Sequence, residues 1–435
     1  MPQKQSGKKT PKASKDDPPL KNFSLSRYFP KSTEYFYGYP AEEDSHFFNG
    51  VPPEIEELVA ARPLICAGPN VKVFCFRNTL SEPGWSILRN ELKTVSIKEN
   101  QIITFPKSIN PRIYGPERNK KLKQALARRA TPGKLVMAQP YLSPRLKTHY
   151  QIPSNRIIWL NDKKNLSSYI PAKYLPKIYD EFLDGKCFKE AQYKIPLPCV
   201  IKVSSSSSGD GVRICKTEKD LRRAKRNFAK LEGIILATEF IEAKRNLGVQ
   251  FGIPADPEKP IEVINWHEQL VNKKGQFMGG IIENCQNKFK NLEKILLTKI
   301  LPEIRKKGWY GIGGFDILIT QNSRFCFIDP NFRMTGMTVY DCLTRNKVIK
   351  KSCLVFTGMF RGTAKEFRKK IVPIAKKDDL NQILYITTLI KHGKIFRFNA
   401  ALLFENRKEI PKLIKKVLSK GVISSILQKH TVKSF

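Results

Sequence analysis

The sequence has no uninterrupted apolar run long enough to cross a bilayer, and its N-terminus is polar rather than signal-like. A membrane-spanning helix needs about 20 predominantly apolar residues, and a secretory signal needs an apolar segment near the first residue. We therefore expect no membrane span, no membrane partner and a cytoplasmic protein.

Cysteine and histidine are sparse and scattered. The nine cysteines include no C-x-x-C pair, and the five histidines show no H-E-x-x-H spacing. An odd number of well-separated cysteines with mostly apolar neighbours predicts reduced, buried thiols rather than a disulfide framework or a zinc site. A catalytic thiol is the less favoured alternative.

Acidic residues are few beside the basic ones, 39 against 78, which gives a net charge of +39 over 435 residues. A charge of this size attracts phosphate-rich or acidic partners over long range. However, lysines are spread along the whole chain, and no RNP, zinc-finger or helix-turn-helix signature occurs. The sequence favours a charge that serves solubility and leaves a specific acidic partner open.

A chain of this length predicts two or three domains. Residues 1–21 have almost no apolar content, so we expect a disordered basic tail. An N-terminal α/β domain is expected over residues 22–160, whose aromatic-rich start, 22–49, should wrap a surface without regular elements. A second α/β unit is expected over 161–345 and a C-terminal α/β extension, packed on that unit, over 346–435.

Apolar runs and their periodicity predict the individual elements. In the first domain, strands are expected at 63–66, 71–76, 135–138 and 157–160, with a helix at 117–129. The second unit should contain strands at 199–203, 212–215, 234–238, 249–253 and 262–271, and helices at 218–231 and 292–307. A hairpin is predicted at 314–320 and 325–329, and a strand and a helix at 395–404 and 409–419.

A lysine precedes a loop of small residues within residues 198–211. Lys202 lies in an apolar run expected as a strand, and serines and glycines follow it up to Gly211. Without bulky side chains, backbone N–H groups can close around a phosphate while the lysine supplies positive charge. A hairpin loop with an exposed lysine is the alternative, and no Walker A pattern occurs.

Two acids lie in the predicted hairpin, Asp316 on its first strand and Asp329 on its second. Asn331 and Arg333 follow Asp329 at alternate positions, which face one side of a strand, so all can point into one cleft. Carboxylate and amide oxygens suit Mg²⁺ bound to phosphates. A solvated polar face is the alternative, disfavoured because apolar residues surround both acids.

A third segment, from Glu239 to Glu242, follows the apolar run 234–238. A strand that leads into a short acidic and apolar connection is typical of a hinge over a purine. There the backbone would meet the base edge and a carboxylate the ribose hydroxyls. An acid that simply ends a strand in solvent is the alternative.

Taken in this order, the residues from about Asn161 to Arg333 resemble the ATP-grasp family. Residues 198–211 are similar to its phosphate loop, 239–242 to its hinge, and 309–316 with 328–333 to its paired metal-binding strands. Lys163 resembles an earlier phosphate-contacting lysine, and residues 63–160 the α/β domain before the grasp. The loop is serine-rich where the family is glycine-rich, and Asp316 and Asp329 stand where glutamate is common.

The resemblance implies catalytic roles for Lys202 and Arg333 and two Mg²⁺ ions on Asp316, Asp329 and Asn331. The residues implied to contact ATP are Lys163, Lys202, Ser206, Ser207, Ser208, Gly209, Gly211, Glu239, Phe240, Ile241 and Glu242.

The overall layout is most similar to the biotin carboxylase branch, but neither bicarbonate-handling residues nor a biotin carrier segment is found. The resemblance therefore implies a carboxylate–amine ligase that uses small-molecule or peptide substrates. ATP would phosphorylate the carboxylate, and an amine would displace the phosphate from the acylphosphate to give an amide. Two alternatives remain: an ATP-grasp enzyme acting on an acidic macromolecule, and a non-catalytic nucleic-acid-binding protein on this scaffold.

Overall fold

The computed structural model describes residues 24–36, 53–94, 98–106, 116–138, 144–192, 194–205, 211–272, 275–283, 289–375 and 382–430. The predicted basic tail lies outside these residues, and so do Ser206, Ser207, Ser208 and Gly209 of the predicted phosphate loop. Within the described ranges, no helix is long and apolar enough to cross a membrane.

The N-terminal region is built on a parallel sheet with the strand order β3-β2-β1-β4. These strands are β1 Thr33–Phe36, β2 Val71–Cys75, β3 Ile102–Thr104 and β4 Leu135–Met137, and the helices are α1 Leu25–Tyr28, α2 Pro53–Ala61, α3 Gly84–Thr94 and α4 Pro116–Arg129. Short 3₁₀ helices connect them: η1 Arg62–Cys66, η2 Arg77–Leu80, η3 Glu99–Gln101 and η4 Pro144–Leu146.

Three predictions for this region are wrong. The described part of the aromatic-rich segment forms α1 and the central strand β1 instead of an irregular wrap. Residues 63–66 lie in η1, and residues 157–160 lie in the helix α5 Ser154–Asn161; both were predicted as strands. A buried run of four apolar residues fits a helix as well as a strand, so tertiary packing decided these cases.

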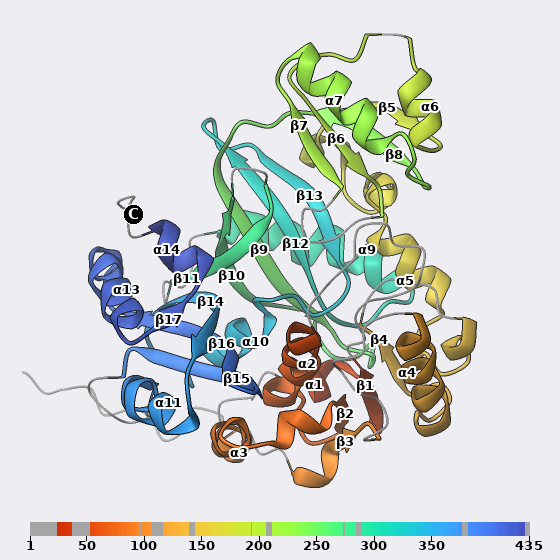
Figure 1. The fold of residues 1–435 in the computed structure, drawn as a ribbon. Helices are drawn as coiled ribbons and strands as arrows, with labels where there is room; N and C mark the ends of the chain where they lie inside the picture. Colours follow the sequence, from red (N-terminus) through yellow and green to blue (C-terminus); the bar gives the residue numbers. More distant parts are fainter. Residues whose placement is uncertain are drawn as a thin grey trace, which may run out of the picture.

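A small antiparallel sheet stands apart at the top of Figure 1, with the order β5-β8-β6-β7. Its strands are β5 Ile178–Phe182, β6 Cys199–Val203, β7 Val212–Cys215 and β8 Ile235–Glu239, and its helices are α6 Gly185–Glu190 and α7 Glu218–Phe228. The helices cover one face, where a core of its own forms around Phe188, Phe228 and Ile201. The segments η5 Lys163–Ser168 and η6 Ala172–Tyr174 lead into this sheet from α5.

The described residues also form one large nine-stranded sheet, ordered β13-β12-β9-β10-β11-β14-β16-β15, with β17 paired to β14. Its strands are β9 Ala243–Ile253, β10 Glu262–Val271, β11 Phe277–Ile282, β12 Gly311–Thr320, β13 Phe325–Asn331, β14 Ser352–Arg361, β15 Leu384–His392, β16 Ile395–Phe404 and β17 Val422–Ile423. The predicted C-terminal extension therefore continues the sheet that holds the hairpin with the two acids.

Helices cover this large sheet (Figure 1). They are α8 Lys290–Ile295, α9 Leu301–Lys306, α10 Thr338–Arg345, α11 Ala364–Lys370, α12 Val372–Ala375, α13 Ile410–Ser419 and α14 Ser425–His430, with η8 Arg407–Glu409. A π-helical turn, η7 Leu296–Ile300, joins α8 to α9. Gly308, with φ of +76°, follows α9, as predicted for the end of this helix.

An aromatic core supports the strands that hold the acids. Phe315 contacts Phe251, Phe327 and Phe332, with ring centroids 5.2, 5.3 and 5.9 Å away, and Trp309 lies 5.0 Å from Phe332. All five side chains are buried. Close packing of this kind leaves few alternative positions for the backbone of β12 and β13.

The cysteine prediction is confirmed for the described residues. All eight described cysteines are free, and all except the exposed Cys187 are buried. Burial raises the pKa of the Cys66 and Cys75 thiols to about 12, so these groups are unreactive at neutral pH.

Candidate active site

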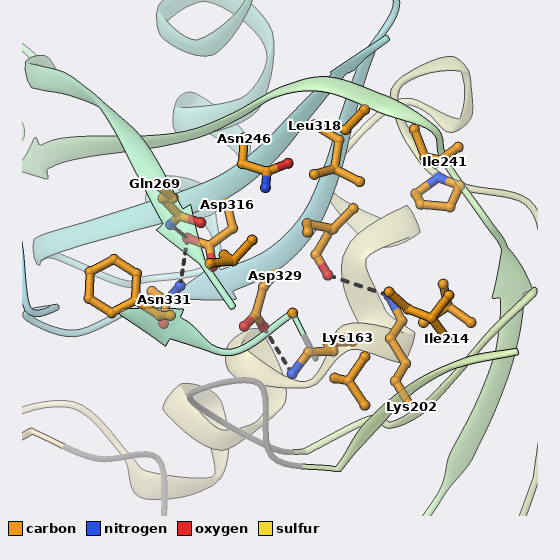
Figure 2. Close-up of a pocket in the computed structure, with 18 of the residues that line it drawn as sticks. Lys163, Lys202, Ile214, Ile241, Asn246, Gln269, Asp316, Leu318, Asp329 and Asn331 are labelled. Atoms are coloured by element: carbon orange, nitrogen blue, oxygen red, sulfur yellow. Dashed lines mark hydrogen bonds and ion pairs between the residues drawn. The ribbon is translucent and has the colours of Figure 1, made fainter. Parts of the chain in front are cut away.

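A cavity of about 370 Å³ lies between the small sheet and the large sheet. Figure 2 shows its polar end, where side chains from both sheets point toward one another. The small sheet contributes Val200, Lys202, Val212, Ile214 and Thr238; the large sheet contributes Asn246, Gln250, His267, Gln269, Asp316, Leu318, Ile328, Asp329 and Asn331.

The two acids face one another across the β12–β13 pair, in the register Asp316 to Asp329. The next pair joins Ile317 to Phe327, so Ile328 is an extra residue in β13, a β-bulge. The bulge changes the alternation: Phe327 points into the aromatic core, while both Ile328 and Asp329 line the cavity. Asp329 thus reaches the cavity although it lies only two residues from a core side chain.

Amide side chains surround Asp316. The Gln269 Nε2 atom donates to Asp316 Oδ1 at 2.7 Å, and Asn331 Nδ2 lies 3.5 Å from the same oxygen. Burial, together with the negative charge of Asp329, raises the pKa of the Asp316 carboxyl to about 7. Two facing carboxylates of this kind favour a cation between them.

Two buried lysines from different elements converge on β13. Lys163, at the start of η5, places Nζ 2.9 Å from Asp329 Oδ1. Lys202, on β6, donates from Nζ to the carbonyl oxygen of Ile328 at 3.4 Å. Burial and the positive charge of Lys163 lower the pKa of Lys202 to about 8. Both ammonium groups therefore lie beside the acids, where phosphate oxygens could replace their present acceptors.

The predicted hinge lines the cavity only in part. Glu239, Phe240 and Ile241 are lining residues, whereas Glu242 is exposed and is not among them. Both oxygens of Glu239 accept hydrogen bonds from Arg324, at 3.1 and 3.3 Å. The contact predicted between Glu242 and ATP therefore stays a prediction, with this side chain outside the cavity lining.

The remaining predicted residues are placed as follows. Arg333 lines the cavity, and its Nη1 atom donates to the Met334 carbonyl at 3.2 Å. Gly211 has φ of +74°, a conformation that favours glycine, and its carbonyl accepts from the Val203 N–H at 2.9 Å.

The polar lining residues that sequence reasoning missed include Asn246, Gln250, His267 and Gln269. His267 and Gln269 are two apart on β10, and alternation along that strand was the signal that could have found them. The buried imidazole of His267 lies 3.0 Å (Nδ1 to Oδ2) from the equally buried Asp341 of α10. No sequence pattern connected that histidine with an acid 74 residues away.

Comparison with known proteins agrees with this geometry. Residues 180–331 match the family described as L-aspartate–L-methionine ligase, ATP grasp. The ADP complex of an N5-carboxyaminoimidazole ribonucleotide synthetase is similar at 11% identity, covering 94% of this chain and 100% of that one, with a TM-score of 0.54.

Two further solved structures share the architecture. The biotin carboxylase of Campylobacter jejuni has 14% identity, covering 86% of this chain and 90% of that one, with a TM-score of 0.53. The biotin carboxylase domain of Hydrogenobacter thermophilus 2-oxoglutarate carboxylase, in complex with MgADP, ADP and bicarbonate, has 11% identity. It covers 87% of this chain and 90% of that one, with a TM-score of 0.52.

Together, the fold and the family match define the class: residues 180–331 match an ATP-grasp ligase family, the chain shares the fold of the solved structures above, and it is an ATP-dependent ligase. The predicted α/β fold and its family resemblance are thereby confirmed. Within that class, the family that matches residues 180–331 is the ATP grasp of L-aspartate–L-methionine ligase. The matched segment contains every strand from β6 to β13 and the last three residues of β5.

Proposed function

We propose that this protein joins a carboxylate to an amine as an amide while ATP is converted to ADP and phosphate. The observation that supports this most is the convergence of Lys163 and Lys202 on Asp316, Asp329 and Asn331 in one cavity. Lysines can neutralise phosphate oxygens beside acids that hold a divalent cation. The matched family's name supports two amino acids as substrates, so L-aspartate and L-methionine are the first pair to test.

The acid cluster fits Mg²⁺, in keeping with the MgADP in one similar structure. Asp316, Asp329 and Asn331 offer hard oxygen ligands. Burial and the nearby charge of Asp329 raise the pKa of Asp316, and a bound cation would offset both effects. Among the described residues no three His, Cys, Asp or Glu side chains cluster. Two carboxylates and one amide would therefore hold the two ions that the family resemblance implies. When bound, Mg²⁺ neutralises phosphate charge.

The apolar part of the cavity fits a purine. Val200, Ile214, Ile241, Leu318 and Ile328 form an apolar slot between the sheets. The backbone of residues 239–241 borders this slot, where it can meet the edge of a base. We propose that the base lies here and that the phosphates extend toward Lys202 and Lys163.

In the first proposed step, a substrate carboxylate oxygen bonds to the γ-phosphorus, the bond to the β–γ bridging oxygen breaks, and ADP leaves. Lys163 and Lys202 hold oxygens of the transferred group, and Arg333 stabilises the charge that develops near the end of β13. In the second step the amine nitrogen attacks the acyl carbon, the carbon–oxygen bond to phosphate breaks, and the nitrogen loses a proton. The products are an amide and inorganic phosphate.

The test is turnover. We expect ADP and phosphate release to require both amino acids, with a product whose mass equals their sum less one water. A panel of the other amino acids and short peptides follows if this pair is inactive. ATP hydrolysis that no carboxylate or amine in the panel changes would contradict the proposed ligase activity.

The net charge of +39 supports a second candidate, a ligase that acts on an acidic macromolecule. Turnover with acidic polypeptides should then fall steeply as salt rises, whereas turnover with free amino acids should not. The third candidate, a non-catalytic nucleic-acid-binding protein on this scaffold, would bind RNA or DNA and show no turnover in any of these assays.

A further inference from the structure

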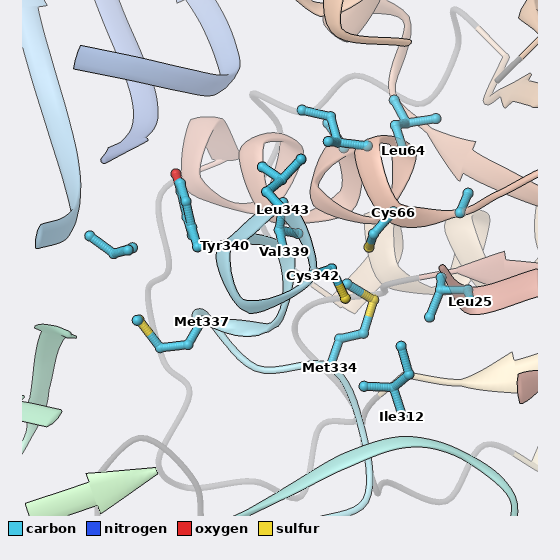
Figure 3. Close-up of a cluster of buried hydrophobic side chains, with 14 of the residues drawn as sticks. Leu25, Leu64, Cys66, Ile312, Met334, Met337, Val339, Tyr340, Cys342 and Leu343 are labelled. Carbon is cyan, nitrogen blue, oxygen red and sulfur yellow. The ribbon is translucent and has the colours of Figure 1, made fainter. Parts of the chain in front are cut away.

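A positive side chain from the N-terminal region lies close to Gly336, a residue that lines the cavity. Arg62 is the first residue of η1, the 3₁₀ helix that packs against α10. Figure 3 shows this contact: Leu64 and Cys66 of η1 lie beside Val339 and Leu343 of α10. Because all four are buried, the position of η1 relative to α10 is fixed by packing.

The segment just before α10 connects Arg62 with the cavity. Gly336, Met337 and Phe277 are cavity-lining residues at the end away from the purine slot. A Cβ atom built on Gly336 would lie 3.4 Å from Phe277 Cε1 and 3.9 Å from Arg62 Nη1. Since residue 336 has no side chain, nothing from that residue separates the Arg62 guanidinium from the cavity.

Two guanidinium groups lie near this end, and neither forms an ion pair with an acid in the part of the chain that the structure describes. Among the residues that the structure describes, half-buried Arg62 forms no hydrogen bond or ion pair, and the one hydrogen bond of Arg333 goes to the Met334 carbonyl. Partly buried guanidinium groups in this arrangement favour an anion that pairs with them.

We propose that Arg62 binds an anionic group, a carboxylate or a phosphate, of the second substrate, so that the N-terminal region forms part of the acceptor site. That the bound molecule is the second substrate rests on the proposed ligase function. Arg62 lies outside residues 180–331, so the family match assigns it no role. The apolar side chains of Phe277 and Met337 border the same end, so the anionic group would be carried on a partly apolar molecule.

The test compares Arg62→Gln with a matched control, Arg77→Gln. Arg77 is an exposed arginine of η2 in the same region and does not line the cavity. Binding is measured by thermal shift and calorimetry in the presence of Mg²⁺ and a non-hydrolysable ATP analogue. The probes are the 20 free amino acids, their carboxamides, and phosphoserine and inorganic phosphate as the phosphate arm.

We expect at least one carboxylate or phosphate probe to bind the wild type and Arg77→Gln about 10- to 100-fold more tightly than Arg62→Gln. Arg62→Lys should recover part of the affinity, and the carboxamide should bind wild type and Arg62→Gln equally weakly. In turnover, the KM of that substrate should rise far more than kcat falls. The affinity for the ATP analogue should stay unchanged, which also shows that Arg62→Gln is folded.

A second variant removes no charge. Gly336→Ala adds a methyl group at ordinary contact distances from Phe277 and Arg62, so it should fold, yet it takes up space beside the guanidinium that a bound anion would need. We expect weaker binding of the same probe.

Each result is decisive. Binding and turnover that are equal in wild type and Arg62→Gln overturn the Arg62 assignment and leave the ligase proposal standing. Arg62-dependent binding without any turnover supports the assignment and overturns the ligase proposal. No binding of any probe to the wild type overturns both.

Discussion

The two walls of the cavity, formed by the small sheet and the large sheet, differ in the side chains that line them and in the hydrophobic cores behind them. The small sheet contributes one lysine, Lys202, among mostly apolar side chains, and it packs around its own core. The large sheet contributes acids and amides on strands backed by the aromatic core. The contacts between the walls include Lys163 N–H to the Ser204 carbonyl at 3.0 Å and the Arg324–Glu239 ion pair. Neither wall carries a complete site, so the proposed chemistry depends on both.

The largest effect should come from the large sheet. Asp329→Asn removes one carboxylate charge without changing volume, so the packing of Phe327 should survive while the affinity for Mg²⁺ and the position of Lys163 are lost. We expect turnover to fall about 100-fold or more, with the unfolding midpoint nearly unchanged. Asp256→Asn, an exposed turn residue, is the control. Normal turnover with normal Mg²⁺ dependence in Asp329→Asn would refute the metal site.

The lysine of the small sheet should matter next. Lys202→Ala removes a charge that faces phosphate oxygens, worth roughly 1.5–3 kcal/mol, and so should weaken ATP binding about 10- to 100-fold by calorimetry. The pKa of Lys202 is lowered to about 8, so its ammonium group loses its charge as pH rises above 8. The affinity of the wild type for ATP should therefore also decrease above pH 8. Lys219→Ala, on an exposed position of α7, should bind normally. Unchanged binding in Lys202→Ala would remove the lysine from the site.

A smaller effect concerns stability and pH in the absence of nucleotide and Mg²⁺. The folded pKa of Asp316, about 7, lies above its ordinary value of 3.8, so the folded state holds a proton that the unfolded state releases between these values. The stability from this proton is present below about pH 4 and is lost as pH rises through 7. Asp316→Asn should remove this loss and be on the order of 1 kcal/mol more stable than wild type at pH 8 in urea unfolding. Identical pH profiles would contradict the shifted pKa.

The connection between the walls should give the smallest effect. Glu239→Gln weakens an ion pair with Arg324 whose side chains are 29% and 38% exposed, and such pairs contribute about 0–1 kcal/mol. We expect less than about a fivefold change in ATP affinity. A loss as large as that of Lys202→Ala would mean that Glu239 contacts the nucleotide directly.

Some elements of the two walls could be predicted from the sequence, and others could not. Strands 199–203, 212–215, 262–271 and 395–404 were predicted with the observed bounds, because each has turn residues on both sides. The facing of Asp316 and Asp329 was also predicted, since it follows from a hairpin with short strands. The bulge at Ile328 was not, because the residues around it carry no glycine or other signal for an extra residue.

What could not be predicted comes from distant segments. Gln269 reaches Asp316 only because β9 lies between β10 and β12, an order that no local pattern contains. Arg62 approaches Gly336 only through the packing of η1 on α10. Helix and strand remained ambiguous where a run was as short as residues 157–160, and there the buried environment favoured the helix α5.

The continuity of the large sheet has a consequence for dissecting the protein. β11 pairs with β14 through Gly280–Val355, Ile281–Leu354 and Ile282–Cys353. A chain ended at residue 345 would leave the backbone groups of β11 without these partners, beside the apolar side chains of Ile281 and Ile282. Open apolar edges of this kind recruit other strands and promote aggregation. The C-terminal strands therefore cover the edge of β11. Residues 1–345 expressed without these strands should aggregate, whereas the full chain should stay soluble.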